Sequence, residues 1–275
     1  MHSLRRAIAL GAVALIAVLA LAASASAAPT WAPAASATVH PGVQTVTNGG
    51  QCTSNFVFYD ASDTVYLGQA AHCSSQGTQT DTNGCTTQSL PIGTPVTISG
   101  ASKPGTLAYN SWITMQQAGE TNADACAYND LALIKVDPAD VGKVNPSIPF
   151  WGGPTGLNDT IGTGQKVLSY GNSSLRLGIT QLSPKEGYEL QQAGNGWSHQ
   201  VGTVTPGIPG DSGSAFMDKQ GRAFGVLSTL ALAPIPASNG VGDLTRELQY
   251  LAGHTSLGVT LANGTEPFRG PLLPV

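Results

Sequence analysis

Three residues whose side chains together can perform nucleophilic catalysis stand in three short motifs of the sequence. His72 lies in Ala-Ala-His-Cys, Asp130 opens the apolar run Asp-Leu-Ala-Leu-Ile, and Ser212 is central in Gly-Asp-Ser-Gly-Ser. A serine hydroxyl becomes a strong nucleophile when an imidazole accepts its proton, and a carboxylate can hold that imidazole in the required tautomer. Singly, each motif also fits an exposed histidine, a strand cap or a glycine turn. Together, in the order His, Asp, Ser, they predict a site that attacks a carbonyl carbon.

These motifs and their order resemble the active-site motifs of the trypsin and chymotrypsin superfamily, specifically its bacterial secreted branch. The resemblance extends from about residue 43 to residue 251. It implies an all-β fold of two six-stranded antiparallel β-barrels (chymotrypsin-like), and a short C-terminal helix is expected beside them. It also implies a serine endopeptidase that cleaves polypeptide substrates through a His72–Asp130–Ser212 triad and an acyl-enzyme intermediate, without a cofactor.

The resemblance assigns the oxyanion hole to the backbone amides of Gly210 and Ser212, which would stabilise the negative charge of the tetrahedral intermediate. In many animal members of the superfamily, a newly cut N-terminus pairs with the aspartate before the serine, which here is Asp211. This chain has no Lys or Arg between Arg6 and Lys103, so cleavage after a basic residue cannot create such a terminus ahead of the barrels. Asp211 must have a different partner, because a buried unpaired carboxylate is costly.

The resemblance also implies a pocket for the side chain that precedes the scissile bond, lined by Pro206, Ser228 and Leu230. Pro206 stands where trypsin-like members carry an aspartate, and Leu227 stands where Glu-specific members carry a histidine. Leu230 replaces a residue that is usually small. We therefore expect a preference for an apolar or small side chain at this position of the substrate.

Four cysteines, Cys52, Cys73, Cys85 and Cys126, predict two disulfides in an exported chain, and their spacing leaves three pairings open. The resemblance implies that Cys73 pairs with Cys52, which leaves Cys85 for Cys126. No Cys-x-x-Cys or His-x-x-x-His pair is present, so no metal site is expected.

Residues 1–27 have the pattern of a signal peptide. Arg5 and Arg6 precede an apolar run over residues 7–23, and Ala-Ser-Ala at residues 25–27 is a small-residue cleavage site. A membrane anchor is the alternative, because the run is nearly long enough to span a bilayer. We favour the signal peptide, because the run is rich in alanine, and hence a secreted, extracellular protein.

We divide the rest of the chain into three expected parts according to the motifs that each contains. We expect a leader or short propeptide over residues 28–42, an N-terminal barrel with His72 and Asp130 over 43–150, and a C-terminal barrel with Ser212, a helix and a tail over 151–275. Only 10% of the residues are charged, while 34 are Gly and 18 are Pro, which is typical of β-rich extracellular proteins. The net charge of −4 argues against nucleic acid and anionic membranes as partners, and we expect a monomer without an integral membrane segment.

Short apolar segments separated by turn residues predict strands over residues 43–47, 55–59, 64–67, 95–99, 106–109, 131–136, 166–170 and 225–229. One helix is predicted after Asp243, which can cap it, with Leu244, Leu248 and Leu251 on one face. His199 is expected in an exposed loop, with a place in the substrate pocket as the alternative.

Two other functions compete with the endopeptidase. A protease-like binding scaffold without activity usually lacks a complete triad, whereas this chain has all three residues. An esterase or lipase of the α/β-hydrolase type requires Gly-x-Ser-x-Gly and the order Ser, acid, His. The motif around Ser212 ends in Ser214 instead of glycine, and the chain order is different, so the hydrolase alternative is disfavoured.

Overall fold

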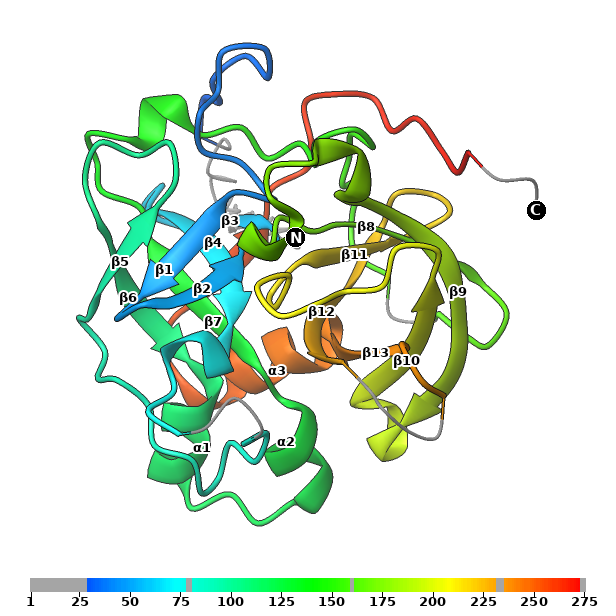
Figure 1. Cartoon of the computed structure of the whole chain (residues 1–275). Coiled ribbons are helices and arrows are strands. Elements are labelled where there is room, and N and C mark those ends of the chain that lie inside the picture. Colours follow the sequence, from blue (N-terminus) through cyan, green and yellow to red (C-terminus); the bar gives the residue numbers. More distant parts are fainter. Residues whose placement is uncertain (1–28, 78–80, 159–160, 231–234, 273–275) are drawn as a thin grey trace, which may run out of the picture.

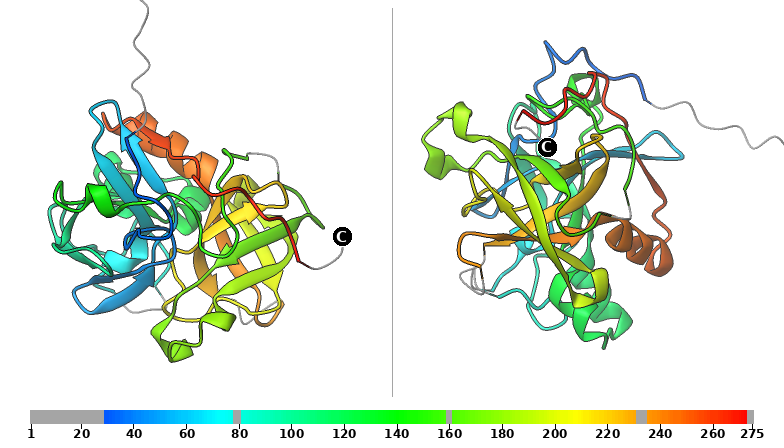
Figure 2. Two further views of the ribbon diagram at one scale, coloured as in Figure 1. Left: turned by 90° about the horizontal axis from the view of Figure 1, so that it is seen from above. Right: turned by 90° about the vertical axis from the view of Figure 1, so that its right-hand side faces the viewer.

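The computed structural model of the chain describes residues 29–77, 81–158, 161–230 and 235–272. Two β-sheets lie side by side, one built mainly from the first half of these residues and the other from the second half (Figure 1; Figure 2, left). The predicted signal peptide lies outside the described residues. Among the described residues, no helix is long and apolar enough to cross a membrane.

The first sheet contains eight strands: β1 (Gln44–Thr47), β2 (Gly50–Thr53), β3 (Val57–Asp60), β4 (Val65–Ala70), β5 (Pro95–Ile98), β6 (Gly105–Asn110), β7 (Leu131–Lys135) and β14 (Val259–Leu261). Their order is β14-β3-β4-β7-β6-β5-β1-β2. The prediction of a closed six-stranded barrel is therefore wrong for this half. An open edge exposes unpaired backbone groups, and β14 from the C-terminal tail covers the edge at β3.

The second sheet is the predicted closed barrel of six strands: β8 (Lys166–Tyr170), β9 (Pro184–Ala193), β10 (Ser198–Thr203), β11 (Ala215–Asp218), β12 (Ala223–Leu230) and β13 (Asn239–Asp243). The strands close in the order β10-β13-β12-β11-β8-β9, and all neighbours are antiparallel. The all-β, chymotrypsin-like class predicted from the motifs is confirmed.

In the described part of the chain, three α-helices accompany the sheets. The predicted C-terminal helix is α3 (Leu244–His254), and the Asp243 carboxylate caps it by accepting the Arg246 backbone N–H at 2.8 Å. Helices α1 (Ser111–Ala118) and α2 (Ala123–Tyr128) were not predicted; asparagine side chains cap both. Figure 1 shows α3 beneath the junction of the two sheets, where it contacts α1 on one side and β12 on the other.

One apolar core joins the two halves. Its fully buried members come from both sheets and from α3, and include Phe56, Phe58, Leu131, Leu168, Val226 and Leu251. Burial of apolar surface contributes about 25 cal/mol per Å², so a shared core of this kind strongly opposes separation of the halves. The junction between the sheets is therefore a fixed platform for the residues that lie on it.

Residues 29–42, predicted as a leader or propeptide, lie against the first half of the protein. Val39 is fully buried, and the Ala32 N–H donates to the Val144 carbonyl at 2.9 Å. The Trp31 ring meets the Tyr59 ring edge-on, with centroids 6.3 Å apart. This segment thus contributes to the packed structure.

Candidate active site

His72 and Asp130 are brought together by the pairing of two neighbouring strands. β4 ends at Ala70 and β7 begins at Leu131, and these two residues are partners in the antiparallel ladder. His72 Nδ1 lies 2.7 Å from Asp130 Oδ2, and the His72 backbone N–H donates to Asp130 Oδ1 at 2.8 Å. The Asp130 side chain is 4% exposed and the His72 side chain 24%. The result is a bonded pair whose imidazole still reaches solvent.

Two further groups hold Asp130 in place. The hydroxyl of Ser228, which was predicted to line the substrate pocket, donates to Asp130 Oδ2 at 2.5 Å from strand β12 of the second barrel. The Asp130 backbone N–H donates to Oε1 of Glu247 on α3 at 2.8 Å. Glu247 was not predicted from the sequence, because a glutamate in the first turn of a helix is ordinarily exposed. Both bonds cross between the two halves of the protein.

The surroundings of His72 predict how activity depends on pH. Burial alone lowers the pKa of His72, but the attraction of Asp130 and its hydrogen bond outweigh burial and raise that pKa. A general base must be neutral, so we expect kcat/KM to fall as the pH drops through a value above about 6.5. In Asp130→Asn the activity should be much lower and this acid limb should move to lower pH. Profiles of kcat/KM against pH test this, and an unmoved limb would contradict it.

Glu247 lies fully buried behind Asp130. Burial raises the pKa of its carboxyl well above the usual range; the bond from the Asp130 N–H opposes this rise, and the charges of Asp130 and Asp243 add to it. The Oε2 atom has no hydrogen-bond partner among the described residues. Glu247 therefore stays neutral at pH values where an exposed glutamate is ionised.

Glu247→Gln is expected to make the protein more stable than the wild type at higher pH. A carboxyl whose pKa is raised by folding keeps a proton that the unfolded chain releases. The free energy of unfolding therefore falls as the pH rises from about 4.3 toward the folded-state pKa. Glutamine remains neutral, so the variant should match the wild type at low pH and be more stable at higher pH. Urea unfolding across this pH range measures the difference. Glu266→Gln, a change at an exposed glutamate, is the control. If the free energy of unfolding changes with pH equally in Glu247→Gln and in the wild type, the prediction is wrong.

The turn that carries Ser212 packs against the end of β4. The Ser212 carbonyl accepts the Thr53 N–H at 2.8 Å. Gly213 has φ +88°, and a Cβ there would lie 2.8 Å from the Ala70 nitrogen and 2.6 Å from the Thr53 oxygen, so this position requires glycine. Ala70 precedes His72 by two residues. Ser212 and His72 therefore lie at the same junction between the sheets.

The Ser212 side chain is partly exposed, and its hydroxyl forms no hydrogen bond with His72 or with any other described residue. The bond between a nucleophile and its base is often long before substrate binds. Hydrogen bonds thus join His72 to Asp130, while the turn that carries Ser212 packs against the end of β4, two residues before His72.

The backbone before Ser212 leaves two amides available. The Pro209 carbonyl accepts the Ser173 hydroxyl at 2.6 Å, and the Pro209–Gly210 peptide bond is trans. The Gly210 N–H therefore points away from Ser173. Among the described residues, neither the Gly210 nor the Ser212 amide has an acceptor. An oxyanion is the kind of group that such free amides bind.

Asp211 has charged partners, as its burial requires, and they could not be identified from the sequence. Its carboxylate lies 2.6 Å from Arg176 Nη2 and 3.0 Å from Lys185 Nζ, and it accepts the backbone amides of Ser173 and Ile208 at 2.9 and 3.1 Å. Burial raises the pKa of Asp211, but the charges of Lys185 and Arg176 and their hydrogen bonds to the carboxylate outweigh burial and lower that pKa. Arg176 and Lys185 thus supply the positive charge that the buried Asp211 carboxylate requires.

The other two predicted pocket residues, Pro206 and Leu230, lie in the segment before this turn and at the end of β12. Arg176 Nη2 donates to the Pro206 carbonyl at 2.9 Å and also to the Asp211 carboxylate, so Arg176 links Pro206 to Asp211. Leu230 is the last residue of β12 and is 40% exposed. Substrate binding by Pro206 and Leu230 stays a prediction.

His199 is not in an exposed loop, so that prediction is wrong. It lies on β10 with only 1% of its surface exposed. Its Nε2 is 3.0 Å from Asp243 Oδ2, its Nδ1 is 3.6 Å from Glu189 Oε1, and its ring meets Phe224 edge-on. Asp243 thus supplies a hydrogen-bond partner inside the barrel, whereas His199 Nδ1 and both Glu189 carboxylate oxygens have no hydrogen-bond partner among the described residues.

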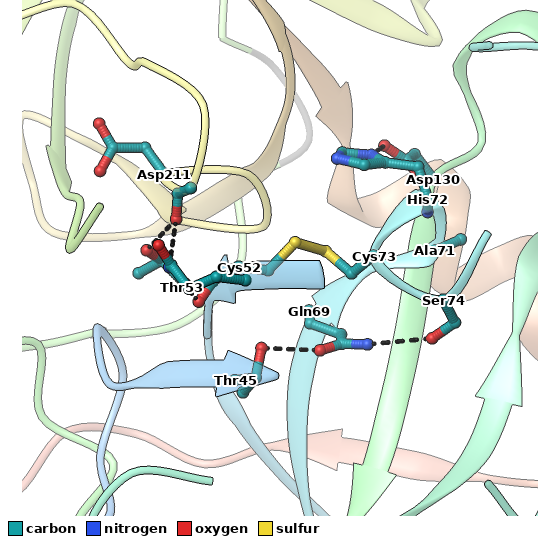
Figure 3. The surroundings of a disulfide bond; sticks show 12 residues. Thr45, Cys52, Thr53, Gln69, Ala71, His72, Cys73, Ser74, Asp130 and Asp211 are labelled. Atoms are coloured by element: carbon teal, nitrogen blue, oxygen red, sulfur yellow. Dashed lines mark hydrogen bonds and ion pairs between the residues drawn. A yellow bond between two sulfur atoms is a disulfide. The ribbon is translucent and has the colours of Figure 1, made fainter. Parts of the chain in front are cut away.

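Both cystine bridges have the pairing that the resemblance implies, Cys52–Cys73 and Cys85–Cys126. Figure 3 shows the first bridge between Asp211 and the His72–Asp130 pair. Among the described residues, the one group of potential metal ligands close enough to share an ion is Cys52, His72 and Cys73. The two sulfur atoms are already bonded to each other, so this group does not favour a metal site.

The fold is similar to that of solved bacterial serine proteases. Protease A from Thermobifida fusca superposes with a TM-score of 0.53 and 15% identity, over 82% of this chain and 99% of that one. A Nocardiopsis protease superposes with a TM-score of 0.51 and 16% identity, over 81% of this chain and 98% of that one. A glutamic acid-specific serine protease superposes with a TM-score of 0.51 and 17% identity, over 82% of this chain and 100% of that one.

The chain matches no protein-family model, and no curated protein matches it. At 15–17% identity, the structural similarity establishes the fold. The chain has the fold of the bacterial chymotrypsin-like serine proteases.

Proposed function

We propose that this protein is a secreted serine endopeptidase that acts through His72, Asp130 and Ser212. The observation that carries the proposal is the 2.7 Å contact between His72 Nδ1 and Asp130 Oδ2, at the junction against which the Ser212 turn packs. A proton on Nδ1 leaves Nε2 free to act as a base toward the open face of the site. The substrates are polypeptides, and no cofactor is needed.

In the proposed mechanism, the substrate carbonyl enters between Ser212 and the free amides of Gly210 and Ser212. Ser212 Oγ attacks the carbonyl carbon while His72 Nε2 takes the hydroxyl proton, and Asp130 stabilises the imidazolium. The amides bind the oxyanion. His72 then protonates the leaving amine, and a water molecule activated by the same imidazole hydrolyses the acyl-enzyme.

An extracellular location agrees with the chemistry of the chain. Two disulfides persist in oxidising compartments, and neither would be expected in a reducing cytosol. The apolar N-terminal run with its small-residue cleavage site supplies the export signal. We propose that the exported protein works as a monomer.

Labelling with a fluorophosphonate tests the proposed function. We expect the folded protein to be modified at Ser212, as mapped by peptide mass spectrometry, because only an activated serine reacts quickly. His72→Ala should abolish labelling. His254→Ala, a change at an exposed histidine at the end of α3, should leave it intact.

The competing binding-scaffold function rests on one observation, the absent hydrogen bond between His72 and Ser212 among the described residues. A scaffold predicts that folded protein is not labelled at any serine. Labelling that maps elsewhere than Ser212 would likewise refute the proposed triad.

A further inference from the structure

Asn239, at the start of β13, lies between the two segments that border the proposed substrate pocket. It pairs in the ladder with Leu230 of β12, and none of its surface is exposed. The segment that begins at Pro206 lies on its other side. The inference drawn from this residue rests on the proposed function.

The Asn239 amide bonds to both segments at once. Its Oδ1 accepts the Gly207 N–H at 2.7 Å, and its Nδ2 donates to the Gly207 carbonyl and the Thr229 carbonyl, both at 3.1 Å. Three bonds on one buried amide satisfy most of its hydrogen-bonding capacity. The side chain is therefore a fixed bridge across the space between the two segments.

The packing around Gly207 leaves no free space beside this bridge. A Cβ added at Gly207 would lie 2.5 Å from Leu227 Cδ1 and 3.0 Å from Asn239 Nδ2. Real Cβ atoms do not approach other heavy atoms as closely as 2.5 Å, so a methyl group at Gly207 would fit only if the Leu227 side chain moved. The Leu227 and Asn239 side chains occupy the volume behind Gly207.

We propose that Asn239 forms the floor of the pocket and restricts the substrate residue before the scissile bond to a small one, such as Ala, Ser or Gly. A longer side chain would displace the amide and leave the Gly207 N–H, the Gly207 carbonyl and the Thr229 carbonyl without partners. Unpaired buried polar groups cost more than a hydrogen bond contributes. Asn239 carries no charge, so it offers no counter-charge to an Arg, Lys or Glu side chain.

Quenched peptides that differ only at this residue test the inference. We expect wild-type kcat/KM to be at least tenfold higher for Ala than for Leu or Phe, the size of effect that one or two methylene groups produce in a closed pocket. Asn239→Ala should open the floor and shift the Leu-to-Ala ratio at least tenfold toward Leu. Asn239→Ser is a second variant with a smaller change in volume and the same expected direction.

Asn145→Ala is the matched control, because Asn145 is also a buried, triply bonded asparagine but contacts Ala32, Ser147 and Thr265. Its Leu-to-Ala ratio should equal that of the wild type. A wild-type enzyme that prefers Leu, Phe, Arg or Glu overturns the inference, whether or not the variants fold, and leaves the proposed function standing if fluorophosphonate still labels Ser212. Absence of labelling overturns the function itself.

Discussion

Ser212→Ala is expected to lower kcat by about 10⁶-fold while leaving the fold and the thermal stability unchanged. The hydroxyl makes no hydrogen bond among the described residues, so its removal disrupts no internal contact. The backbone of the turn, which is held by Thr53 and Gly213, remains in place. The whole effect should therefore fall on the chemical step, with KM nearly constant.

Steady-state kinetics on a cleaved peptide measure this loss. Because the residues of a triad act as a unit, adding His72→Ala to Ser212→Ala should produce little further decrease. His254→Ala serves again as the control for a distant histidine. A Ser212→Ala variant that kept a hundredth of the wild-type rate would show that the nucleophile is a different residue.

Asp211→Asn is expected to cost about 3–5 kcal/mol in the free energy of unfolding, the usual effect of breaking a buried ion pair by removing one partner. The Asp211 and Lys185 side chains are fully buried and Arg176 is 9% exposed, so two cations would face each other without a counter-charge. Asp211 stands between Gly210 and Ser212 in the sequence. We therefore also expect slower labelling of Ser212, because the turn that presents its amides would lose its anchor.

Urea unfolding at neutral pH measures the change in stability, and a double variant supplies the control. Lys185→Met added to Asp211→Asn removes one uncompensated cation and should restore part of the lost stability, as neighbouring charges couple strongly. The pKa of Asp211 is lowered in the folded state. Asp211 therefore stabilises the fold at pH values above its pKa in the unfolded chain, and this stabilisation is lost as the pH falls through its pKa in the folded protein. A loss below about 1 kcal/mol would contradict the anchoring role.

The strands predicted from sequence were those whose apolar residues alternate or run together, such as β5, β7 and β8. Strand β9 was missed because its residues include Lys185, Glu186 and Glu189, which are buried through ionic and polar contacts. Polar residues on the inner face remove the alternation on which strand prediction depends. Strand β13 was missed because two of its five residues are glycine.

The three motifs of the proposed triad could be recognised in the sequence because each is a short contiguous string, whereas the contacts that support them join distant parts of the chain. Glu247 reaches Asp130 across 117 residues, and Arg176 reaches Asp211 across 35. Nothing local marks either residue as a partner. Helix α1 carried a usable signal that we overlooked, the Asn110 cap at its start and Gly119 in the left-handed region at its end.

The pairing of β14 with β3 has a consequence for how the molecule is made. Thr260 and Tyr59 are ladder partners, although 201 residues separate them (260 − 59). The first sheet therefore cannot be completed during synthesis until the chain has emerged as far as Leu261, the last residue of β14. Contacts of such long range slow folding. Removing the last twenty residues should therefore impair the sheet at the opposite end of the sequence, and with it the junction at which a peptide would be cut.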